Sequence, residues 1–400
     1  MTLYFMRIID DCIGMWICKL LGACIKIKCI LIPPHTDIAP DKVRKILCQK
    51  YLGMGSILNA IPLMKGLRKQ YPNAKIIFIT TKSNRKIIPL CNMADEVLFV
   101  NFDSFSLFIK DVVKNLFYLM REGIDISIDL EFFAKFSMLV SILSMSKVRV
   151  GLYHNKIRPE GILTHKIYYN PYKHISEIYF AYAVALSIER KEEYFKDIIP
   201  SFKSSFEKSV RENFSLKTNT KIIVINVNAG ELFIFRRWPA SYFVELIKLL
   251  VKNYPEYYYI LIGGKFDYEY VDDIYKKTGV CERLINAAGL TSIEELFTLI
   301  EMSYLVITND SGPLHIASLY GKNIVVLFGP ETPIIYGPTN SNALIFYADD
   351  IYCSPCMSVY DSKKSLYGET CIENRCLLKF KPEEVYSGIE QHFLNHNNGK

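Results

Sequence analysis

The most informative junction of the sequence reads Leu305-Val-Ile-Thr-Asn-Asp-Ser-Gly-Pro-Leu-His315. It begins with Leu305–Thr308, an apolar run rich in β-branched residues, which is typical of a buried strand. Small and polar residues follow, and Pro313 then begins a stretch of helical periodicity that extends to Tyr320. Proline is favoured at the first position of a helix. A strand that passes through a short turn into a helix is the repeating unit of α/β folds.

The turn of this junction has the composition of an anion-binding site. Asp310 or Ser311 can cap the helix, and the backbone amides of Ser311 and Gly312 lie at its positive end. Such a helix N-terminus binds phosphate groups readily. His315 falls in the first turn of the same helix, where it is expected to face the same anion. The alternative is that His315 is a purely structural residue.

The same alternation of β-rich runs and helical stretches extends over both halves of the chain. In the first half the expected strands are Lys45–Lys50, Lys75–Thr80, Glu96–Val100, Asp125–Leu130 and Val148–Leu152, and the expected helices are Ile57–Gln70, Phe105–Met120 and Phe133–Met145. In the second half they are the strands Ile222–Asn226, Tyr258–Ile262, Leu284–Asn286, Leu305–Thr308 and Ile324–Phe328 and the helices Ser241–Asn253, Tyr268–Lys277, Ser292–Glu301, Pro313–Tyr320 and Pro382–Phe393. This order predicts an α/β protein of two doubly wound, Rossmann-like domains that face a central cleft.

Two more strand ends in the second half carry candidate ligand-binding residues. Asn226-Val-Asn-Ala-Gly230, which includes Asn228, is followed by Arg236-Arg-Trp-Pro239. Small residues let backbone amides approach an anion, and an arginine supplies a fork of donors to a diphosphate. Leu261-Ile-Gly-Gly-Lys-Phe-Asp267 places an acid after paired glycines, where nucleotide-binding folds hold a ribose hydroxyl. Both patterns also occur in ordinary β–α loops.

The order of these segments points to a known family. They are, along the chain, Leu52-Gly-Met-Gly-Ser-Ile-Leu-Asn-Ala-Ile-Pro62 with Leu67 and Tyr71-Pro72, then Asn228–Gly230, Arg236–Pro239, Gly263-Gly264, Ala288–Leu296, Asp310–His315 and Leu327–Pro330. Together they resemble glycosyltransferase family 9, the heptosyltransferase-like enzymes of lipopolysaccharide assembly, over residues 43–390. The resemblance implies a GT-B fold whose C-terminal domain holds most of the nucleotide-sugar.

The resemblance also implies roles for individual residues. Arg236 stands where the family places a basic residue on the donor diphosphate. The diphosphate-binding turn of the family is matched by Asp310, Ser311, Gly312 and His315. Asp267 is a looser match to a ribose contact.

The first half departs from the family at a position that matters for the mechanism. The family's opening loop usually reads Gly-Asp, and that aspartate is taken as the base that activates the acceptor hydroxyl. Here the position is Ser56, and a serine has no pKa suited to accepting the proton. Gly53, Gly55 and Ser56 are still expected to form an acceptor-side loop that caps a helix beginning at Ile57.

Asp129 and Glu131 are the candidates to replace the missing base. They lie at the carboxyl end of the strand Asp125–Leu130, and alternation along a strand puts both on one side. We expect Glu131 to be the base, with Asp129 as the second choice. The alternative is that the two acids cap a helix that begins at Phe133.

Composition narrows the class of protein. The chain has 400 residues, 50% of them hydrophobic, and a net charge of +7, which excludes a disordered chain and a disulfide-stapled miniprotein. Eight basic and four acidic residues fall in the first fifty. We call the apolar N-terminal segment, residues 1–40, the leader. Because charged residues interrupt it, the leader fits neither a signal peptide nor a membrane-spanning helix.

Wound as a helix, the leader is amphipathic. One face carries Phe5, Ile9, Ile13, Trp16 and Leu20, while the cations lie on the other. Two interpretations are open: residues 1–33 bind an anionic membrane surface, or they pack on the protein's own core.

Four of the eleven cysteines form a separate pattern near the C-terminus, namely Cys353, Cys356, Cys371 and Cys376. One Cys-x-x-Cys knuckle followed by a Cys-x4-Cys pair suits a structural zinc. Free or redox-paired thiols are the alternative. No export signal is present, which favours a reducing compartment.

The sequence thus predicts a leader (1–40), an acceptor domain (41–205), a nucleotide-sugar-binding domain (206–380) with a cysteine-rich segment (353–376), and a C-terminal helix (381–400) that packs back toward the domain junction. The predicted function is an inverting, metal-independent glycosyltransferase that moves a sugar, such as heptose, to a lipid-linked or lipopolysaccharide acceptor. We expect it on the inner face of the cytoplasmic membrane, with no nucleic-acid partner and no cofactor for catalysis. Because of Ser56, a non-catalytic glycan- or nucleotide-binding protein is the alternative; a nucleotide-sugar epimerase would need a third glycine after Gly55.

Overall fold

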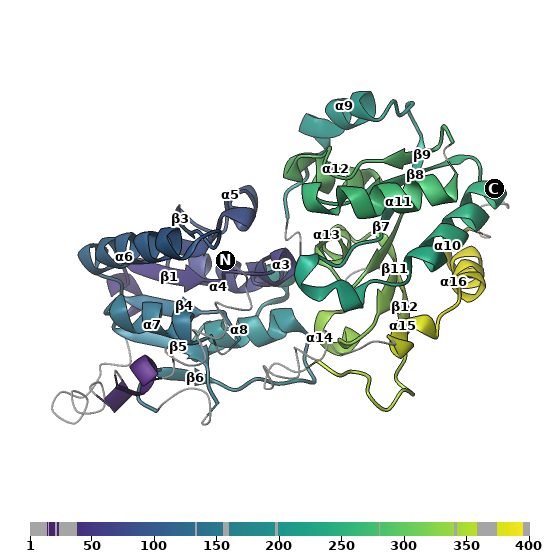
Figure 1. Cartoon of the computed structure of the whole chain (residues 1–400). Coiled ribbons are helices and arrows are strands. Elements are labelled where there is room, and N and C mark those ends of the chain that lie inside the picture. The colour runs from purple at the N-terminus through teal and green to yellow at the C-terminus, as the bar shows by residue number, and fades with distance from the viewer. Residues whose placement is uncertain are drawn as a thin grey trace. The chain divides into compact units, whose positions relative to one another are not determined.

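The computed structural model describes residues 14, 16–20, 22–23, 38–132, 134–154, 160–196, 199–279, 281–339, 342–357 and 374–394. The chain divides into two compact units, residues 1–198 (unit 1) and 199–400 (unit 2). In each unit a twisted sheet of parallel strands carries helices on both faces (Figure 1). Unit 2 begins shortly before α9 (Lys203–Asn213), a helix whose one buried residue is Val210.

The unit 1 sheet has the strand order β3-β2-β1-β4-β5-β6, all parallel. Its strands are β1 (Lys45–Gln49), β2 (Lys75–Thr81), β3 (Glu96–Val100), β4 (Ile126–Asp129), β5 (Val148–Leu152) and β6 (His165–Ile167). Its helices are α3 (Met54–Asn59), α4 (Ile61–Gln70), α5 (Ile87–Leu90), α6 (Phe105–Glu122), α7 (Lys135–Leu143) and α8 (Ile175–Ala185). The strand order reverses between β1 and β4, so this is the point at which a doubly wound sheet opens for a ligand.

Unit 2 repeats this plan with the strand order β12-β11-β10-β7-β8-β9. Its strands are β7 (Lys221–Asn226), β8 (Tyr257–Ile262), β9 (Leu284–Asn286), β10 (Leu305–Asn309), β11 (Asn323–Phe328) and β12 (Ala343–Tyr347). Its helices after α9 are α10 (Ala240–Asn253), α11 (Tyr268–Thr278), α12 (Ile293–Met302), α13 (Gly312–Leu319), α14 (Pro333–Tyr336), α15 (Arg375–Leu378) and α16 (Pro382–Ile389). Here the order reverses between β7 and β10.

Burial on both faces explains the high apolar content of the central strands, because parallel sheets are covered by helices on each side. The core of unit 2 is centred on Trp238, which is fully buried. Its indole N–H donates to Phe380 O at 3.0 Å and so ties the end of the chain to the sheet. The final helix α16 packs on α10 and β12 within this unit.

The sequence predicted this fold closely but not completely. The α/β class, the two doubly wound units and all ten expected strands are confirmed, with strand ends that differ by at most one residue. The expected helix from Ile57 is wrong at its start, because α3 begins at Met54 with Gly53 as its N-cap and Ser56 inside the helix. The expected helix from Phe133 begins instead at Lys135. The strands β6 and β12 and the helices α5, α8, α14 and α15 are additional.

The leader is described only in part, and most of the residues from 1 to 33 lie outside the described residues. Residues 16–20 are helical, and Cys18 is buried against Met138 and Ile162 while Trp16 and Leu20 are 75% and 68% exposed. The leader therefore packs on unit 1 through one face and presents apolar side chains on another. Among the described residues, no helix is both long and apolar enough to span a bilayer.

Candidate functional site

The candidate donor site lies at the carboxyl edge of the unit 2 sheet. The strand order reverses there between β7 and β10, and open α/β sheets bind ligands at such a switch point. The loops that follow β7, β8, β10 and β11 carry the expected donor-binding residues and one that was not expected: Asn228, Arg236, Asp267, Asp310, Ser311, Gly312 and Glu331.

A hydrogen-bond network joins the ends of β7 and β10. Asn226 Nδ2 donates to Ser311 Oγ at 2.7 Å and to Thr308 Oγ1 at 3.0 Å. Ser311 Oγ donates to Asn309 O at 3.1 Å, and Asn309 Nδ2 donates to Asn228 O at 3.2 Å. Since most of these side chains are buried, the network holds the two loops in one arrangement.

Asn228 is held at the end of β8. Its Nδ2 donates to Ile262 O at 2.9 Å. This close approach requires glycine at position 263, because a Cβ on Gly263 would lie 2.7 Å from Asn228 Nδ2. Asn228 Oδ1 is buried and has no hydrogen-bond partner within the described part of the chain. A buried acceptor of this kind is commonly satisfied by water or a ligand.

Arg236 bridges two buried acids. Its Nη1 lies 3.1 Å from Asp310 Oδ2, and its Nη2 lies 3.0 Å from Glu331 Oε1. Burial lowers the pKa of Arg236, but both carboxylates raise it above its ordinary value, so the guanidinium stays charged. Burial raises the pKa of Asp310, against the opposing effect of Arg236. Burial likewise raises the pKa of Glu331 to about 7, although Arg236 opposes this shift.

The N-terminus of α13 is not capped as the sequence predicts. Ser311 occupies the N-cap position, but no side chain accepts a capping hydrogen bond there among the described residues. Ser311 Oγ bonds to Asn226 and Asn309, and Asp310 pairs with Arg236. The expected side-chain cap is therefore wrong, and no side chain of the described residues caps the positive end of this helix. His315 is buried in this helix.

Asp267 forms an ion pair with Arg237. Arg237 Nη2 is 3.2 Å from Asp267 Oδ1, and Gly264 N donates to Asp267 Oδ2 at 3.0 Å. The Arg237 guanidinium also lies over the ring of Tyr270, 4.4 Å from its centroid. A ribose hydroxyl would share Asp267 with these partners.

In unit 1, Glu131 is the acid at the reversal between β1 and β4. Its Oε2 accepts from Lys50 Nζ at 2.9 Å, and its Oε1 accepts from Tyr51 N at 2.7 Å. Lys50 is buried, and although burial lowers its pKa, Glu131 raises it above the ordinary value. Burial raises the pKa of the Tyr179 hydroxyl on α8; the charge of Lys50 lowers this pKa and the charge of Glu131 raises it. Glu131 thus forms an ion pair with a buried lysine at the end of the neighbouring strand.

Asp129 and Ser56 are placed differently from Glu131. Asp129 is fully buried, with Oδ2 accepting from Ser137 Oγ at 2.9 Å and Oδ1 from Glu131 N at 3.0 Å. Neither acid caps α7, whose N-cap is Ala134 without a side-chain cap, so the capping alternative is wrong. A Cβ on Gly53, which has a φ of +85°, would lie 3.3 Å from Ser56 Oγ. Glycine is favoured there because side chains rarely adopt this positive φ.

Comparison with known proteins adds to this geometry. The family model for glycosyltransferase family 9 (heptosyltransferase) matches residues 117–366, more than half of the chain. The chain belongs to this family. The resemblance expected from the sequence motifs is confirmed, and the chain is a glycosyltransferase.

Relatives and solved structures agree with the family. "Lipooligosaccharide heptosyltransferase 2" of Campylobacter jejuni serotype O:6 is 26% identical over 84% of this chain and 96% of that protein. "Lipopolysaccharide heptosyltransferase 3" of Escherichia coli K12 is 25% identical over 78% of this chain and 90% of that protein. A family 9 glycosyl transferase from Veillonella parvula has a TM-score of 0.67 at 20% identity, covering 90% of this chain and 99% of its own. The E. coli ADP-heptose lps heptosyltransferase II has a TM-score of 0.65 at 21% identity, covering 88% and 99%. The expected GT-B fold is confirmed.

Two residues of the candidate sites in this family 9 chain were not predicted from the sequence motifs. Lys50 directly follows β1, and Glu331 follows Leu-Phe-Gly-Pro at the end of β11. A lysine at the end of a buried strand is a usable signal, since buried lysines are rare unless paired. Glu331 gives no local signal, because only the fold brings it to Arg236.

The cysteine motif is partly outside the described residues, because Cys371 falls there. Cys353 is exposed, Cys356 half-buried and Cys376 buried. Within the described part of the chain, no three His, Cys, Asp or Glu side chains are grouped to hold a metal. Structural zinc therefore stays a prediction.

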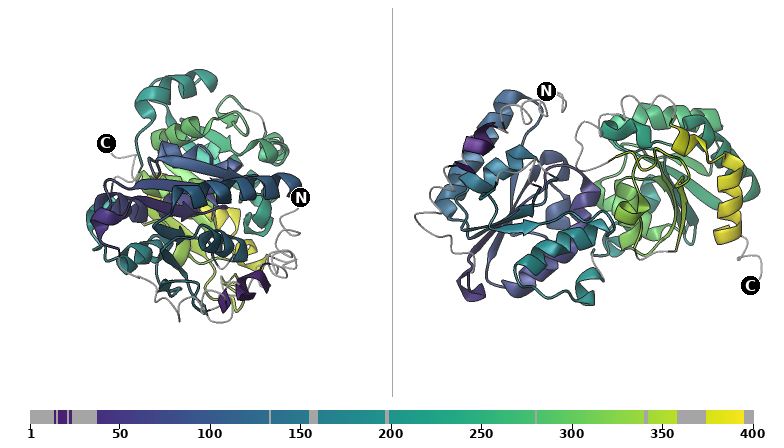
Figure 2. Two further views of the ribbon diagram at one scale, coloured as in Figure 1. Left: turned by 90° about the vertical axis from the view of Figure 1, so that its left-hand side faces the viewer. Right: turned by 90° about the horizontal axis from the view of Figure 1, so that it is seen from below.

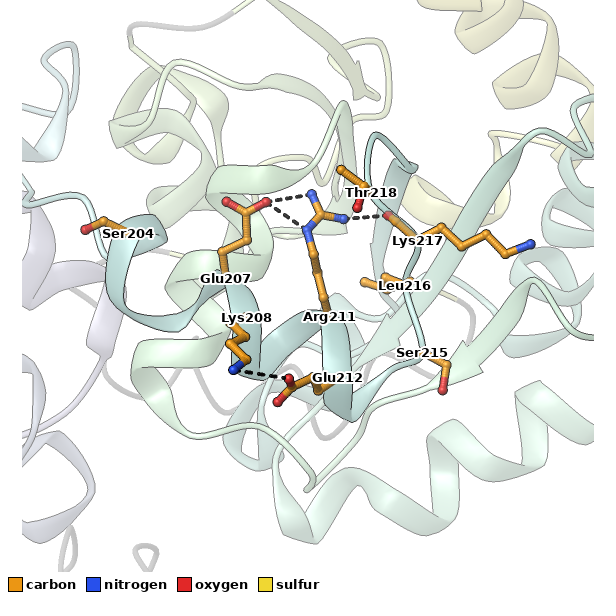
Figure 3. Close-up of a pocket in the computed structure, with 9 residues that line it drawn as sticks. All are labelled: Ser204, Glu207, Lys208, Arg211, Glu212, Ser215, Leu216, Lys217 and Thr218. Atoms are coloured by element: carbon orange, nitrogen blue, oxygen red, sulfur yellow. Dashed lines mark hydrogen bonds and ion pairs between the residues drawn. The ribbon is translucent and has the colours of Figure 1, made fainter.

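A pocket in unit 2 lies away from these residues. It is formed by α9 and the loop after it, and four of its charged side chains form the ion pairs Glu207–Arg211 and Lys208–Glu212 (Figure 3). Glu207 Oε1 lies 2.6 Å from Arg211 Nη2, and Arg211 Nη1 donates to Lys217 O at 2.7 Å. It contains none of the candidate site residues.

Proposed function

We propose that the chain is an inverting glycosyltransferase that moves heptose from ADP-heptose to a lipid-linked or lipopolysaccharide saccharide. The observation that carries the proposal is Arg236 beside the uncapped N-terminus of α13 at the switch point of unit 2. The relatives named above are heptosyltransferases of lipooligosaccharide and lipopolysaccharide, and one structural neighbour is named for ADP-heptose.

Unit 2 would hold the donor. The diphosphate would accept hydrogen bonds from Arg236 and from the amides of Ser311 and Gly312, with His315 in the same helix turn. Asn228 Oδ1 and Asp267 are the acceptors available to hydroxyl groups of the donor. As the diphosphate leaves, these fixed donors would stabilise its charge without a metal, which is how preorganised sites lower such barriers.

Unit 1 would supply the base. We propose that Glu131 takes the proton from the acceptor hydroxyl as its oxygen attacks the anomeric carbon and the bond to the diphosphate breaks. Glu131 is favoured over Asp129, because Asp129 is fully buried whereas the Glu131 side chain is 14% exposed. Ser56 has no pKa suited to this step, and Gly53 and Gly55 shape the loop around it.

A lipid-linked acceptor would place the enzyme at a membrane. We propose that residues 1–33 hold it on the anionic inner face of the cytoplasmic membrane, where cations beside an apolar helix face are attracted. The exposure of Trp16 and Leu20 supports this role.

Donor selectivity tests the function. The full chain is incubated with a panel of nucleotide-diphosphate sugars, and both its midpoint of thermal unfolding and transfer to a lipopolysaccharide core acceptor are measured. We expect ADP-heptose to raise the midpoint and to support transfer. Donor binding without transfer would favour the non-catalytic alternative, and no shift with any nucleotide-sugar would refute the proposal.

A further inference from the structure

Helix α6 of unit 1 has two apolar faces. Its inner face, with Phe108, Val112 and Leu119, packs on the sheet in the core of unit 1. Its outer face, which we define as Phe105, Ile109, Val113, Phe117 and Met120, is exposed to solvent. The outer residues follow one another at intervals of four, four, four and three, so they form one stripe along the 18-residue helix. A stripe of this length is unusual on a free protein surface.

The exposure of the stripe is substantial at every position. Phe117 is 70% exposed, and the other four side chains are between 42% and 49% exposed. A surface helix normally turns charged or polar residues outward. The stripe therefore indicates a contact that the isolated chain lacks.

Cations flank the stripe on one side. Lys110, Lys114 and Arg121 are exposed and follow the stripe along the helix. The acids of α6 are turned elsewhere, since Asp111 accepts from Asn101 N at 3.0 Å and Glu122 lies 2.8 Å from Lys45 Nζ. The outer face thus combines apolar side chains with positive charge and no acid. This is the pattern of a helix that lies in the interface of an anionic bilayer.

The same face of the unit 1 sheet also carries the leader. Helix α6 contacts α7, and α7 holds Cys18 of the leader through Met138. Lys135 O, also on α7, lies 3.8 Å from Cys18 Sγ. In Figure 2 the described part of the leader lies among the helices on this side of the sheet. The leader exposes Trp16 and Leu20 with Lys19 between them, so two surfaces of similar chemistry share one layer of helices.

We propose that the outer face of α6 is a second surface that binds an anionic lipid bilayer, in addition to the leader. Charge favours this occupant over a second copy of the chain, because two such faces would bring like charges together. Two separate contacts also fix an orientation, whereas a single helix leaves the enzyme free to rotate about it. The inference extends the proposed membrane contact of residues 1–33, yet each surface is tested with the other intact.

The test is cosedimentation of the full chain with vesicles of phosphatidylcholine, alone or mixed with phosphatidylglycerol. Val113→Ser removes an apolar side chain from the stripe, and its matched control is Val184→Ser on α8, where Val184 is 55% exposed. We expect Val113→Ser to weaken binding to the anionic vesicles by roughly fivefold, since affinity scales with buried apolar area. The double variant Val113→Ser with Phe117→Ser should lose most of the affinity that the stripe contributes to anionic vesicles.

A second pair of variants tests the charge. Lys114→Gln should weaken binding roughly fivefold, because each cation near an anionic surface contributes about that much. Lys248→Gln, at an exposed lysine of α10, should change nothing. If both α6 variants sediment like their controls, the proposal is wrong. It is equally wrong if Val113→Ser changes the oligomeric state in light scattering but not vesicle binding, which would make the stripe a contact between copies.

Two further readouts separate the proposals. A leader variant that loses vesicle binding while the α6 variants keep it would leave the leader proposal standing and overturn this one. Transfer to a soluble acceptor fragment reports on the proposed reaction alone, and the α6 variants should leave it unchanged.

Discussion

Arg236 Nη2 lies 3.0 Å from Glu331 Oε1, and the same guanidinium is paired with Asp310. Two buried acids thus share one cation. With both acids ionised the group carries a net negative charge, which opposes the binding of a diphosphate. With Glu331 protonated the group is neutral, and Arg236 can turn its donors to the ligand. We therefore expect the protonation of these two acids, both with raised pKa values, to affect how readily the site binds a diphosphate.

Donor affinity should fall as the pH rises through about 7. Burial raises the pKa of Glu331 to about 7, and a bound anion favours the protonated form still more. The affinity is then high below this pKa and drops above it, by up to roughly tenfold per pH unit in the limit of one coupled proton. Calorimetric titration with ADP-heptose between about pH 6 and pH 8.5 measures this pH dependence of the affinity. The two esterified phosphates of ADP-heptose do not titrate in this range.

Glu331→Gln should remove this dependence. Its affinity at pH 8 should exceed that of the unchanged chain by roughly tenfold, because one negative charge beside the diphosphate is gone. Glu245→Gln, at an exposed glutamate of α10, is the control and should keep the original profile. A pH-independent affinity in the unchanged chain would contradict the assignment.

The fold could be predicted from the sequence because its signals are local. Strands such as β7 and β10 are uninterrupted apolar runs, and each is followed by a turn and a helix. The additional elements have weaker signals: β6 is three residues long and α8 is apolar almost all around. β12 is an edge strand, yet Ala343–Tyr347 has the β-rich composition that would have predicted it.

The candidate site was predicted less completely, because its partners are distant in sequence. Arg236 and Asp310 were identified by motif, but their ion pair and the role of Glu331 depend on three loops meeting at one sheet edge. Likewise, nothing local connects Lys50 with Glu131, which lie 81 residues apart. The expected cap at Ser311 failed for the same reason, since Asn226 from another strand engages its hydroxyl.

Glu131→Gln should lower turnover by roughly 10²–10⁴-fold, the range that a positioned general base contributes. Donor binding should be unchanged, because the donor residues lie on unit 2. Initial rates of transfer give the first quantity, and calorimetric titration with ADP-heptose gives the second. Asp129→Asn is the comparison, and a loss there with normal rates in Glu131→Gln would exchange their roles. Turnover within a fewfold of normal in both variants would leave neither acid as the base.

Lys50→Met should destabilise the chain more than the double change Lys50→Met with Glu131→Gln. Lys50 is buried, and Glu131 loses its cation when Lys50 is removed. Breaking a buried pair on one side costs about 3–5 kcal/mol, and the 14% exposure of the Glu131 side chain reduces this value. Denaturant unfolding of the single and double variants measures the coupling. Equal loss in both would mean that the ion pair contributes nothing to stability.

Trp16→Ser combined with Leu20→Ser should weaken the binding of the protein to anionic vesicles. The two side chains are 75% and 68% exposed, so the change should leave the folded structure intact. Deletion of residues 1–33 is a less clean test, because it also uncovers Met138 and Ile162 where Cys18 packs. A buried aromatic or leucine side chain contributes roughly 1.5–3 kcal/mol, so membrane affinity should drop at least tenfold while ADP-heptose binding is retained. Val184→Ser is again the control for an exposed apolar residue. If the double variant sediments with the vesicles as before, the leader is only a helix packed on unit 1.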